Sequence, residues 1–446
     1  MPKVKFIDLF AGLGGIRLGF EKSFKDLGFE TECVMTSEIK PYAVETISSN
    51  FDHDYFVGDI FNVENEQIPD FDFLLGGFPC QSFSAAGNRH GFAETRGTLF
   101  FEIERILRDK NPYGFILENV EGLVKHDLEN KHDKIGKTLA TILYKLKEEL
   151  GYNVTWKVID SIEFGLPQSR KRIFIVGTKD ETANLNVTKR EFNPLKTILE
   201  NGLETINSDF TQKLFNHFEM EDLYGKSIKD KRGGDNNIHS WDIGVKGEVS
   251  DEQIILLNKL FKERRKKHWA EKIGIDWMDG MALTLKQIST FHKNENLKSL
   301  LDDLVKKGYL RFEHPKKLVR EKTDIGEKKY RTYDKTKPKG YNIVTGKLSF
   351  EINKILDPND IAPTLVATDV SRLAVPDKGG LRRLTIREGL RLFGYPEWYQ
   401  IPVKETEAFD LLGNTVAVPV VEHVATQLAQ IFKANYHFSD LPVEAV

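Results

Sequence analysis

One cysteine stands where the chain could use its sulfur for chemistry. Cys80 lies in the run Gly-Gly-Phe-Pro-Cys-Gln-Ser-Phe-Ser-Ala-Ala-Gly at 76–87, directly after the apolar segment 71–75, which we expect to be a strand. In open α/β sheets ligands bind outside the carboxyl ends of the strands, so a thiol in the following turn is placed for reaction. A thiolate there would be a nucleophile. The alternative is a small buried hydrophobic residue, because free cysteine is among the most buried residue types.

Three more reactive side chains stand at predicted strand ends. Glu118 follows the apolar run 114–117, whereas Arg170 and Arg172 precede the apolar run 173–176. If these ends share one edge of a sheet, a carboxyl group, a thiol and two guanidinium groups line one cleft. Nearby positive charge would favour the thiolate form of the cysteine. The alternative for the acid and the arginines is a structural salt-bridge cluster.

A glycine-rich turn predicts a nucleotide-type cofactor. The run Asp-Leu-Phe-Ala-Gly-Leu-Gly-Gly at 8–15 ends a strand-like segment and leads into the amphipathic stretch 16–24. Glycines allow a tight turn close to a ligand, and a helix N-terminus offers N–H groups to an anion. The spacing departs from G-x-G-x-x-G, which weakens a nicotinamide or flavin interpretation. Glu38 and Asp59 follow the next two strand-like runs, where they could contact a ribose and an adenine.

Length and cysteine content limit the class of protein. A chain of 446 residues exceeds the size at which one core stops growing, so we expect two domains. No apolar run approaches the length of a membrane span and the N-terminus lacks a signal-peptide pattern, so we expect a cytoplasmic protein without membrane contact. Cys33 and Cys80 are the two cysteines, too few for a disulfide framework or a metal site. We interpret Cys33 as a buried strand residue and expect no metal.

The net charge of −3 averages two unlike parts of the chain. Residues 261–340 contain 22 Lys and Arg against 12 Asp and Glu, a balance of +10, which leaves −13 for the remainder. Such asymmetry is typical of a nucleic-acid-facing segment on an acidic enzyme body. The alternative is a solvated basic face without a ligand.

The order of apolar segments predicts an α/β fold with a doubly wound, mostly parallel sheet. Amphipathic stretches, clearest at 99–108 and 137–150, alternate with strand-like runs, as in βαβ units. Right-handed crossovers then bring the functional strand ends to one edge. The strand-like runs are 4–9, 33–37, 55–57, 73–75, 114–117, 154–159 and 173–176. The alternation stops near 180, and helical patterns return at 384–393 and 418–432.

The polar middle region contains a pattern of helix, turn, helix and short strand. Residues 283–288, 297–308 and 309–312 follow this order, and the basic segment 262–269 precedes them. The order resembles a winged helix-turn-helix, which we place near 250–315. The alternative is an ordinary helical hairpin that supports its domain, so contact of this segment with DNA stays open.

Six motifs in order resemble those of the DNA cytosine-5 methyltransferases of Type II restriction–modification systems. The resemblance spans the chain except for roughly residues 180–360. The motifs are the turn at 8–15, Pro79-Cys80-Gln81, Glu118-Asn119-Val120, Gln168-x-Arg170-x-Arg172, Arg383-Leu384-Thr385-x-Arg387-Glu388 and Gly413-Asn414-Thr415-Val416.

The resemblance implies the S-adenosylmethionine-dependent methyltransferase fold with a smaller target-recognition domain inserted. We expect a catalytic and cofactor domain at 1–180, the recognition domain at 181–375 and a returning C-terminal segment at 376–446. The cofactor would be S-adenosyl-L-methionine. The implied catalytic residues are Cys80, Glu118, Arg170 and Arg172, and the implied cofactor-binding residues are Phe10, Gly12, Leu13, Gly15, Glu38, Asp59, Pro79 and Asn414.

The implied activity is methylation of carbon 5 of a specific cytosine in double-stranded DNA, by thiolate addition to a flipped-out base. The small-residue stretch 81–98 would close over that base, and its Arg89, His90 and Arg96 would approach phosphates or simply be solvated. The resemblance further implies a bacterial, DNA-associated enzyme, functionally linked to a restriction endonuclease, and we expect a monomer. The alternatives are a tRNA cytosine-5 methyltransferase and a non-catalytic DNA-binding regulator. The basic insert favours duplex DNA, and the intact Cys80, Glu118, Arg170 and Arg172 favour an enzyme.

Overall fold

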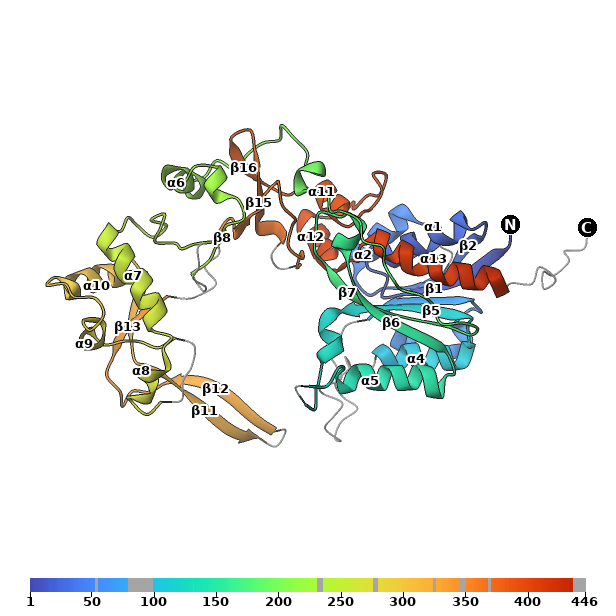
Figure 1. Ribbon diagram of the computed structural model, residues 1–446, viewed down its shortest axis with the longest axis horizontal. Coiled ribbons are helices and arrows are strands. Elements are labelled where there is room, and N and C mark those ends of the chain that lie inside the picture. Colours follow the sequence, from blue (N-terminus) through green and yellow to red (C-terminus); the bar gives the residue numbers. More distant parts are fainter. Residues whose placement is uncertain are drawn as a thin grey trace, which may run out of the picture. The chain divides into compact units, whose positions relative to one another are not determined.

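The chain forms two compact units (Figure 1). The computed structural model describes residues 1–52, 55–78, 99–130, 132–230, 236–275, 280–323, 326–344, 350–367 and 370–435, with the backbone alone at 322–323 and 326–329. Unit 1 comprises Met1–Glu200, Asp357–Ser371 and Leu384–Val446, and unit 2 comprises Asn201–Leu356 and Arg372–Arg383. These units are defined by packing. The functional division at 180/181 and 375/376 stays a prediction.

A seven-stranded sheet organises unit 1, in the order β3-β2-β1-β4-β5-β7-β6. Neighbouring strands pair in parallel except at β7, which is antiparallel to both β5 and β6. The carboxyl ends of β1, β2, β4 and β5 therefore meet at one edge, and the predicted doubly wound, mostly parallel sheet is confirmed. The strands are β1 (Lys3–Leu9), β2 (Glu30–Ser37), β3 (Phe56–Val57), β4 (Phe73–Gly77), β5 (Gly114–Val120), β6 (Asn153–Asp160) and β7 (Lys171–Thr178).

Helices cover both faces of this sheet. In Figure 1, α1 and α13 lie on one face, whereas α4 and α5 lie on the other. The helices of unit 1 are α1 (Gly15–Asp26), α2 (Pro41–Asn50), α4 (Leu99–Lys110), α5 (Lys137–Tyr144), α11 (Ile386–Leu392), α12 (Glu405–Asn414) and α13 (Val418–Asn435). No helix in the described part of the chain is both long and apolar enough to cross a membrane.

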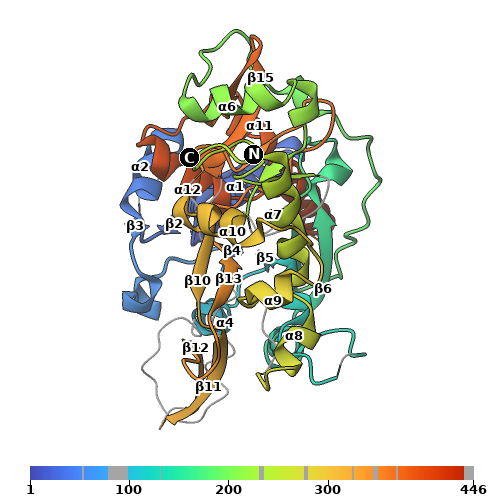
Figure 2. The same ribbon diagram turned by 90° about the vertical axis from the view of Figure 1, so that its left-hand side faces the viewer.

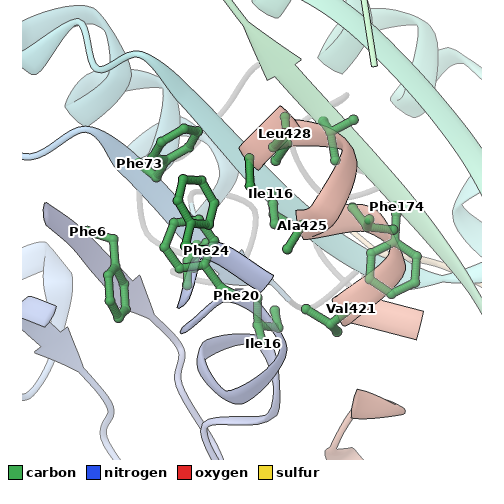
Figure 3. Close-up of a cluster of buried hydrophobic side chains, with 14 of the residues drawn as sticks. Phe6, Ile16, Phe20, Phe24, Phe73, Ile116, Phe174, Val421, Ala425 and Leu428 are labelled. Atoms are coloured by element: carbon green, nitrogen blue, oxygen red, sulfur yellow. The ribbon is translucent and has the colours of Figure 1, made fainter. Parts of the chain in front are cut away.

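An aromatic core joins the two ends of the chain within unit 1 (Figure 3). The rings of Phe20 and Phe24 on α1 have centroids 4.3 Å apart, and Phe24 packs against Phe73 of β4 at 5.0 Å. A Cβ atom at Gly19 would lie 2.7 Å from the Cβ atom of Val421, so the glycine allows α1 and α13 to approach closely. Each fully buried phenylalanine contributes about 1.5–3 kcal/mol. The C-terminal helix is thus part of the core that supports the first strand.

Unit 2 combines a five-stranded sheet, in the order β16-β15-β14-β8-β9, with a helical part (Figure 2). One core surrounds Ile352 and Leu381, and the other surrounds Trp241, Leu301 and Leu304. The strands are β8 (Ser227–Ile228), β9 (Asn237–Ile238), β10 (Leu310–Glu313), β11 (Lys316–Thr323), β12 (Gly326–Tyr333), β13 (Gly340–Ile343), β14 (Lys354–Ile355), β15 (Leu373–Asp377) and β16 (Gly380–Arg383). The helices are α6 (Asp209–His217), α7 (Asp251–Glu263), α8 (Lys267–Glu271), α9 (Leu285–Ile288) and α10 (Leu297–Lys306).

Candidate active site

A cavity of about 320 Å³ opens at the carboxyl edge of the unit 1 sheet. Its walls come from the turn between β1 and α1 and from the ends of β2, β4 and β5, together with β7 and the segment before α13. The predicted site residues that line it are Phe10, Gly12, Leu13, Gly15, Glu38, Glu118, Arg170, Arg172 and Asn414. Residues from distant parts of the sequence therefore meet at one edge, as the order of strands predicts.

The glycine turn forms one wall and accepts no larger residue at two positions. Gly14 caps α1 with a φ of 64°, a left-handed conformation that favours glycine. A Cβ atom at Gly15 would lie 2.6 Å from the Tyr395 hydroxyl and 2.9 Å from Cγ2 of Val416. The first N–H groups of α1 have no partner within the helix, so this turn can bind an anion.

Glu38 is fixed beside the glycine turn by backbone donors. Its Oε2 accepts a hydrogen bond from the Gly12 N–H at 2.9 Å, and its Oε1 accepts one from the Lys40 N–H at 2.9 Å. Each carboxylate oxygen has two acceptor positions, so lone pairs remain for hydroxyl groups of a ligand. A glycine turn that suits a carboxylate and an acid that suits a ribose fit the donors and acceptors of S-adenosylmethionine.

Three other predicted cofactor residues are placed differently. Asp59 is exposed and caps the short 3-10 helix Ile60–Asn62, with its Oδ1 accepting the Phe61 N–H at 3.1 Å, and it is not among the described residues that line the cavity. Asn414 is exposed at the cavity and donates to the Asp410 carbonyl at 2.8 Å. Pro79 lies outside the described residues, and so does the predicted nucleophile Cys80.

The Glu118 side chain is shielded and paired. Its Oε1 accepts a hydrogen bond from Nε of Arg172 at 2.9 Å, and only 12 % of the side chain is exposed. Burial raises the pKa of Glu118 above its usual range, although the positive charges of Arg172 and Arg170 oppose this shift. A carboxyl group with a raised pKa retains its proton more readily near neutral pH.

Asn119 holds the backbone that leads toward Pro79 and Cys80. Its Nδ2 donates to the Phe78 carbonyl at 2.7 Å, and the Phe78 ring is buried against Phe100. The pairing of β4 with β5 places Gly77 opposite Glu118. The last described residues before 79 thus lie beside the shielded acid.

Arg170 and Arg172 have different partners. The Arg170 side chain is buried, and its guanidinium donates to the carbonyls of Leu365 at 3.0 Å and Gly413 at 3.1 Å. Burial and the charge of Arg172 lower the pKa of Arg170, but a guanidinium remains protonated at neutral pH. Arg172 is the residue that pairs with Glu118. The sequence motif predicts both arginines at the site, but it does not predict that Arg170 binds backbone carbonyls while Arg172 pairs with Glu118.

Several side chains that support the cavity carry no predicted site role. The buried Gln168 donates to the Leu392 carbonyl at 3.2 Å and accepts the Leu365 N–H at 3.2 Å. The Tyr399 hydroxyl donates to the Leu13 carbonyl at 2.5 Å and so holds the glycine turn from behind. Gln168 has a signal in its motif, whereas Tyr399 has none because its partner is 386 residues away.

The fold and the site together define the class of protein. A glycine turn after β1 and an acid after β2 are typical of an α/β enzyme that binds a nucleotide-type cofactor. The shielded pair of Glu118 and Arg172, from β5 and β7, lines the same cavity. The surrounding donors fit a ligand with a carboxylate and a ribose.

Comparisons with known proteins identify the family. Residues 4–430 match the family model of C-5 cytosine-specific DNA methylases. The chain is 56 % identical to the Type II methyltransferase M.NlaIV of Neisseria lactamica, covering 96 % of this chain and 99 % of that one. It is 40 % identical to the Type II methyltransferase M.BanI of Aneurinibacillus aneurinilyticus, covering 96 % of each. The solved structure of the S. pombe Dnmt2 methyltransferase shares the fold, with a TM-score of 0.51 at 16 % identity and coverage of 97 % and 100 %.

The chain therefore belongs to the C-5 cytosine-specific DNA methylases, and the resemblance predicted from its motifs is confirmed. It is a DNA cytosine-5-methyltransferase that uses S-adenosyl-L-methionine. The glycine turn and Glu38 are residues of this chain that fit that cofactor.

Proposed function

We propose that this enzyme methylates a specific cytosine in double-stranded DNA as the modification enzyme of a Type II restriction system, protecting host DNA from a cognate endonuclease. The observation that carries the proposal is the shielded Glu118–Arg172 pair at the cavity, beside the strand that leads toward Cys80. The names of M.NlaIV and M.BanI, both Type II methyltransferases, support the restriction context.

The cofactor would be held by residues of the cavity edge. The turn that contains Gly12 and Gly15 would bind its carboxylate, and Glu38 would bind its ribose. S-adenosyl-L-methionine supplies an electrophilic methyl group when bound. The remaining proposed contacts are Phe10, Leu13 and Asn414, which line the cavity, and Pro79. A contact with Asp59, which caps the short helix Ile60–Asn62, stays a prediction from the sequence.

The chemical difficulty is that carbon 5 of cytosine is a poor nucleophile. The Cys80 thiolate adds to carbon 6, which forms a C–S bond and moves an electron pair through the ring toward nitrogen 3. Glu118 in its protonated form donates its proton at nitrogen 3 and neutralises this charge, which leaves an enamine that is nucleophilic at carbon 5. The raised pKa of Glu118 supports this role.

The two arginines support this addition differently. Arg172 provides positive charge beside Glu118 and favours the thiolate. Arg170 is a positioning residue, because its guanidinium holds backbone carbonyls of two returning segments. After methylation, loss of the carbon 5 proton to a base and cleavage of the C–S bond restore the aromatic ring and release the Cys80 thiolate, and the proton on nitrogen 3 returns to Glu118.

The target base must leave the duplex for this chemistry, because a thiol cannot reach carbon 6 above a stacked ring. Flipping costs a few kcal/mol of stacking and pairing. Residues 81–98, which lie outside the described part of the chain, are the segment we propose to close over the flipped base, with Arg89, His90 and Arg96 near phosphates.

A duplex with 5-fluorocytosine at the target position tests the assigned nucleophile. Fluorine at carbon 5 cannot leave as a proton, so the C–S bond persists and the enzyme stays attached to DNA when the cofactor is present. We expect the adduct with the wild type and with the control Cys33→Ala, but not with Cys80→Ala. Cys33 is a matched control because it is buried, and burial raises the pKa of its thiol to about 11. An adduct with Cys80→Ala would show that another residue attacks the base.

A further inference from the structure

The helical part of unit 2 has the chain order of a winged helix-turn-helix. After α7 and the short α8, Leu283 forms a β-bridge with Tyr341, and α9, α10 and β10 follow. The hairpin β11–β12 comes next, and β13 then returns to pair antiparallel with β10. The order helix, strand, helix, helix, strand, hairpin, strand identifies β11–β12 as the wing.

This segment packs as one module with its own core. Ile288 of α9, Leu301 and Leu304 of α10, and Tyr341 of β13 are all buried in the same cluster. Thr284 caps α9 in a capping box with Gln287, which fixes where this helix begins. The packing distinguishes the module from an isolated helical hairpin.

The outward side of α10 offers little positive charge. Lys298 pairs with Asp302 at 2.5 Å, and Asp303 pairs with Lys307 at 2.6 Å. Asp302 also accepts a hydrogen bond from the Tyr341 hydroxyl at 2.8 Å. Within one turn these acids neutralise most of the cations of the helix, so its attraction for a phosphate backbone is weak.

The wing β11–β12, unlike α10, carries cations on one face. Residues that face each other across an antiparallel pair share a face, and the register pairs Lys316 with Tyr333 and Leu318 with Arg331. Arg320 lies two residues after Leu318 and shares that face. We call Lys316, Arg320, Arg331 and Tyr333 the basic face.

The cations of the basic face are exposed and available. Lys316, Arg320 and Arg331 form no ion pair with any residue that the structure describes. The exposed Tyr333 ring lies opposite Lys316 and two residues from Arg331 on the same face, with Nζ of Lys316 5.0 Å from its centroid. Figure 2 shows the hairpin extending away from α7 and α10 within unit 2. Cations interleaved with an aromatic ring suit a nucleic-acid backbone.

We propose that the basic face of the wing, rather than α10, contacts the phosphates of duplex DNA and adds affinity that does not depend on base sequence. This rests on the proposed function, which makes duplex DNA the substrate. Each phosphate that a cation neutralises releases condensed counterions, so these contacts also set part of the salt dependence of binding.

Two variants of the full-length chain that remove the same charge test the assignment. Arg320→Ala/Arg331→Ala removes two cations from the wing, and Lys298→Ala/Lys306→Ala removes two from α10. Dissociation constants would be measured at several salt concentrations for two duplexes. One duplex contains the sequence that the enzyme methylates, and the other lacks that sequence. The wing variant should weaken binding of both duplexes by about tenfold and reduce the salt slope by about 1.8, because each contact contributes roughly 0.9. The α10 variant should change binding less than twofold.

Further measurements keep folding and function apart from the wing assignment. Arg320→Lys/Arg331→Lys should restore most of the affinity, because a phosphate contact needs a charge and not a guanidinium fork. An unchanged wing variant, a stronger effect of the α10 variant, or weakening restricted to the target duplex would overturn the inference. A wild type that binds no duplex DNA would overturn the proposed function as well, whereas wild-type binding with an unaffected wing variant leaves that function intact.

Discussion

The two units use charged side chains in opposite ways. In unit 1 the ionisable groups at the cavity are shielded and held by named partners, such as Glu118 by Arg172 and Arg170 by two carbonyls. In unit 2 the cations of the basic face are exposed, and residues 261–340 carry a net charge of +10. Covalent chemistry requires groups at defined positions away from water, whereas attraction to a polyanion requires accessible charge. Variants in unit 1 should therefore change rate or stability, and variants in the wing should change DNA affinity.

The largest effect that we expect from unit 1, apart from loss of the nucleophile, is on the methyl-transfer rate of Glu118→Gln. An amide cannot donate the proton that addition to carbon 6 requires, so the single-turnover rate should fall by about 10²- to 10⁴-fold. In the wild type the rate should decline as pH rises through the Glu118 pKa, because the protonated form is lost, and the Gln variant should lack this decline. DNA affinity should stay within twofold. Equal loss of affinity and rate would break the division between the units.

The next effect is on the free energy of unfolding. Arg170→Ala should leave the Leu365 and Gly413 carbonyls without their donor, at a cost of about 1–3 kcal/mol for each buried group. Denaturant unfolding should show this loss. Arg170→Lys should retain part of the stability because an ammonium group keeps the positive charge. It should not restore all of it, because an ammonium group lacks the planar guanidinium that donates to two carbonyls at once. Wild-type stability in Arg170→Ala would remove Arg170 from its positioning role.

The last effects separate the two units by how their stability depends on pH. Burial raises the pKa of Asp8 in unit 1 to about 7, although Arg17 opposes the shift. Because the folded pKa lies above the unfolded value of about 3.9, this group stabilises the fold most at low pH, and the contribution is lost as pH rises from about 4 to about 7. Melting temperatures of Asp8→Asn should lack that decline.

Asp377 in unit 2 is the counterpart of Asp8, because its pKa is shifted in the opposite direction. Its hydrogen bond with Arg382 lowers the pKa of Asp377 to about 2, so its contribution is present above about 3.9 and is lost as pH falls toward 2. Asp377→Asn should flatten the acid side of the stability profile and lower the stability on the neutral side, where the wild type has the contribution of the ionised carboxylate. Identical profiles for the two variants would contradict the assigned pKa shifts.

Strand-end residues of unit 1 could be predicted from the sequence because parallel strands bring their ends to one edge. Gly15, Glu38, Glu118 and Arg172 all line the cavity as their positions predict. The clamp formed by Arg170 could not be predicted, because its two acceptors are 195 and 243 residues away and are backbone atoms, which carry no sequence signal.

The wing shows a second limit of prediction. The expected order of helix, turn, helix and strand is present in α9, α10 and β10, but the strands β11 and β12 were not expected. Both strands are rich in Lys, Arg and Glu and lack the alternation of apolar and polar residues that signals a half-buried strand. Because an exposed hairpin buries few side chains, its sequence needs no alternation of apolar and polar residues and does not predict the strands.

Bisulfite sequencing of DNA from cells that express this chain tests the central claim most directly. We predict 5-methylcytosine at one recurring sequence in cells with the wild type, and none at that sequence in cells with Cys80→Ala. Unmodified DNA with the wild type, or persistent methylation with Cys80→Ala, would contradict the claim that this enzyme methylates duplex DNA through Cys80.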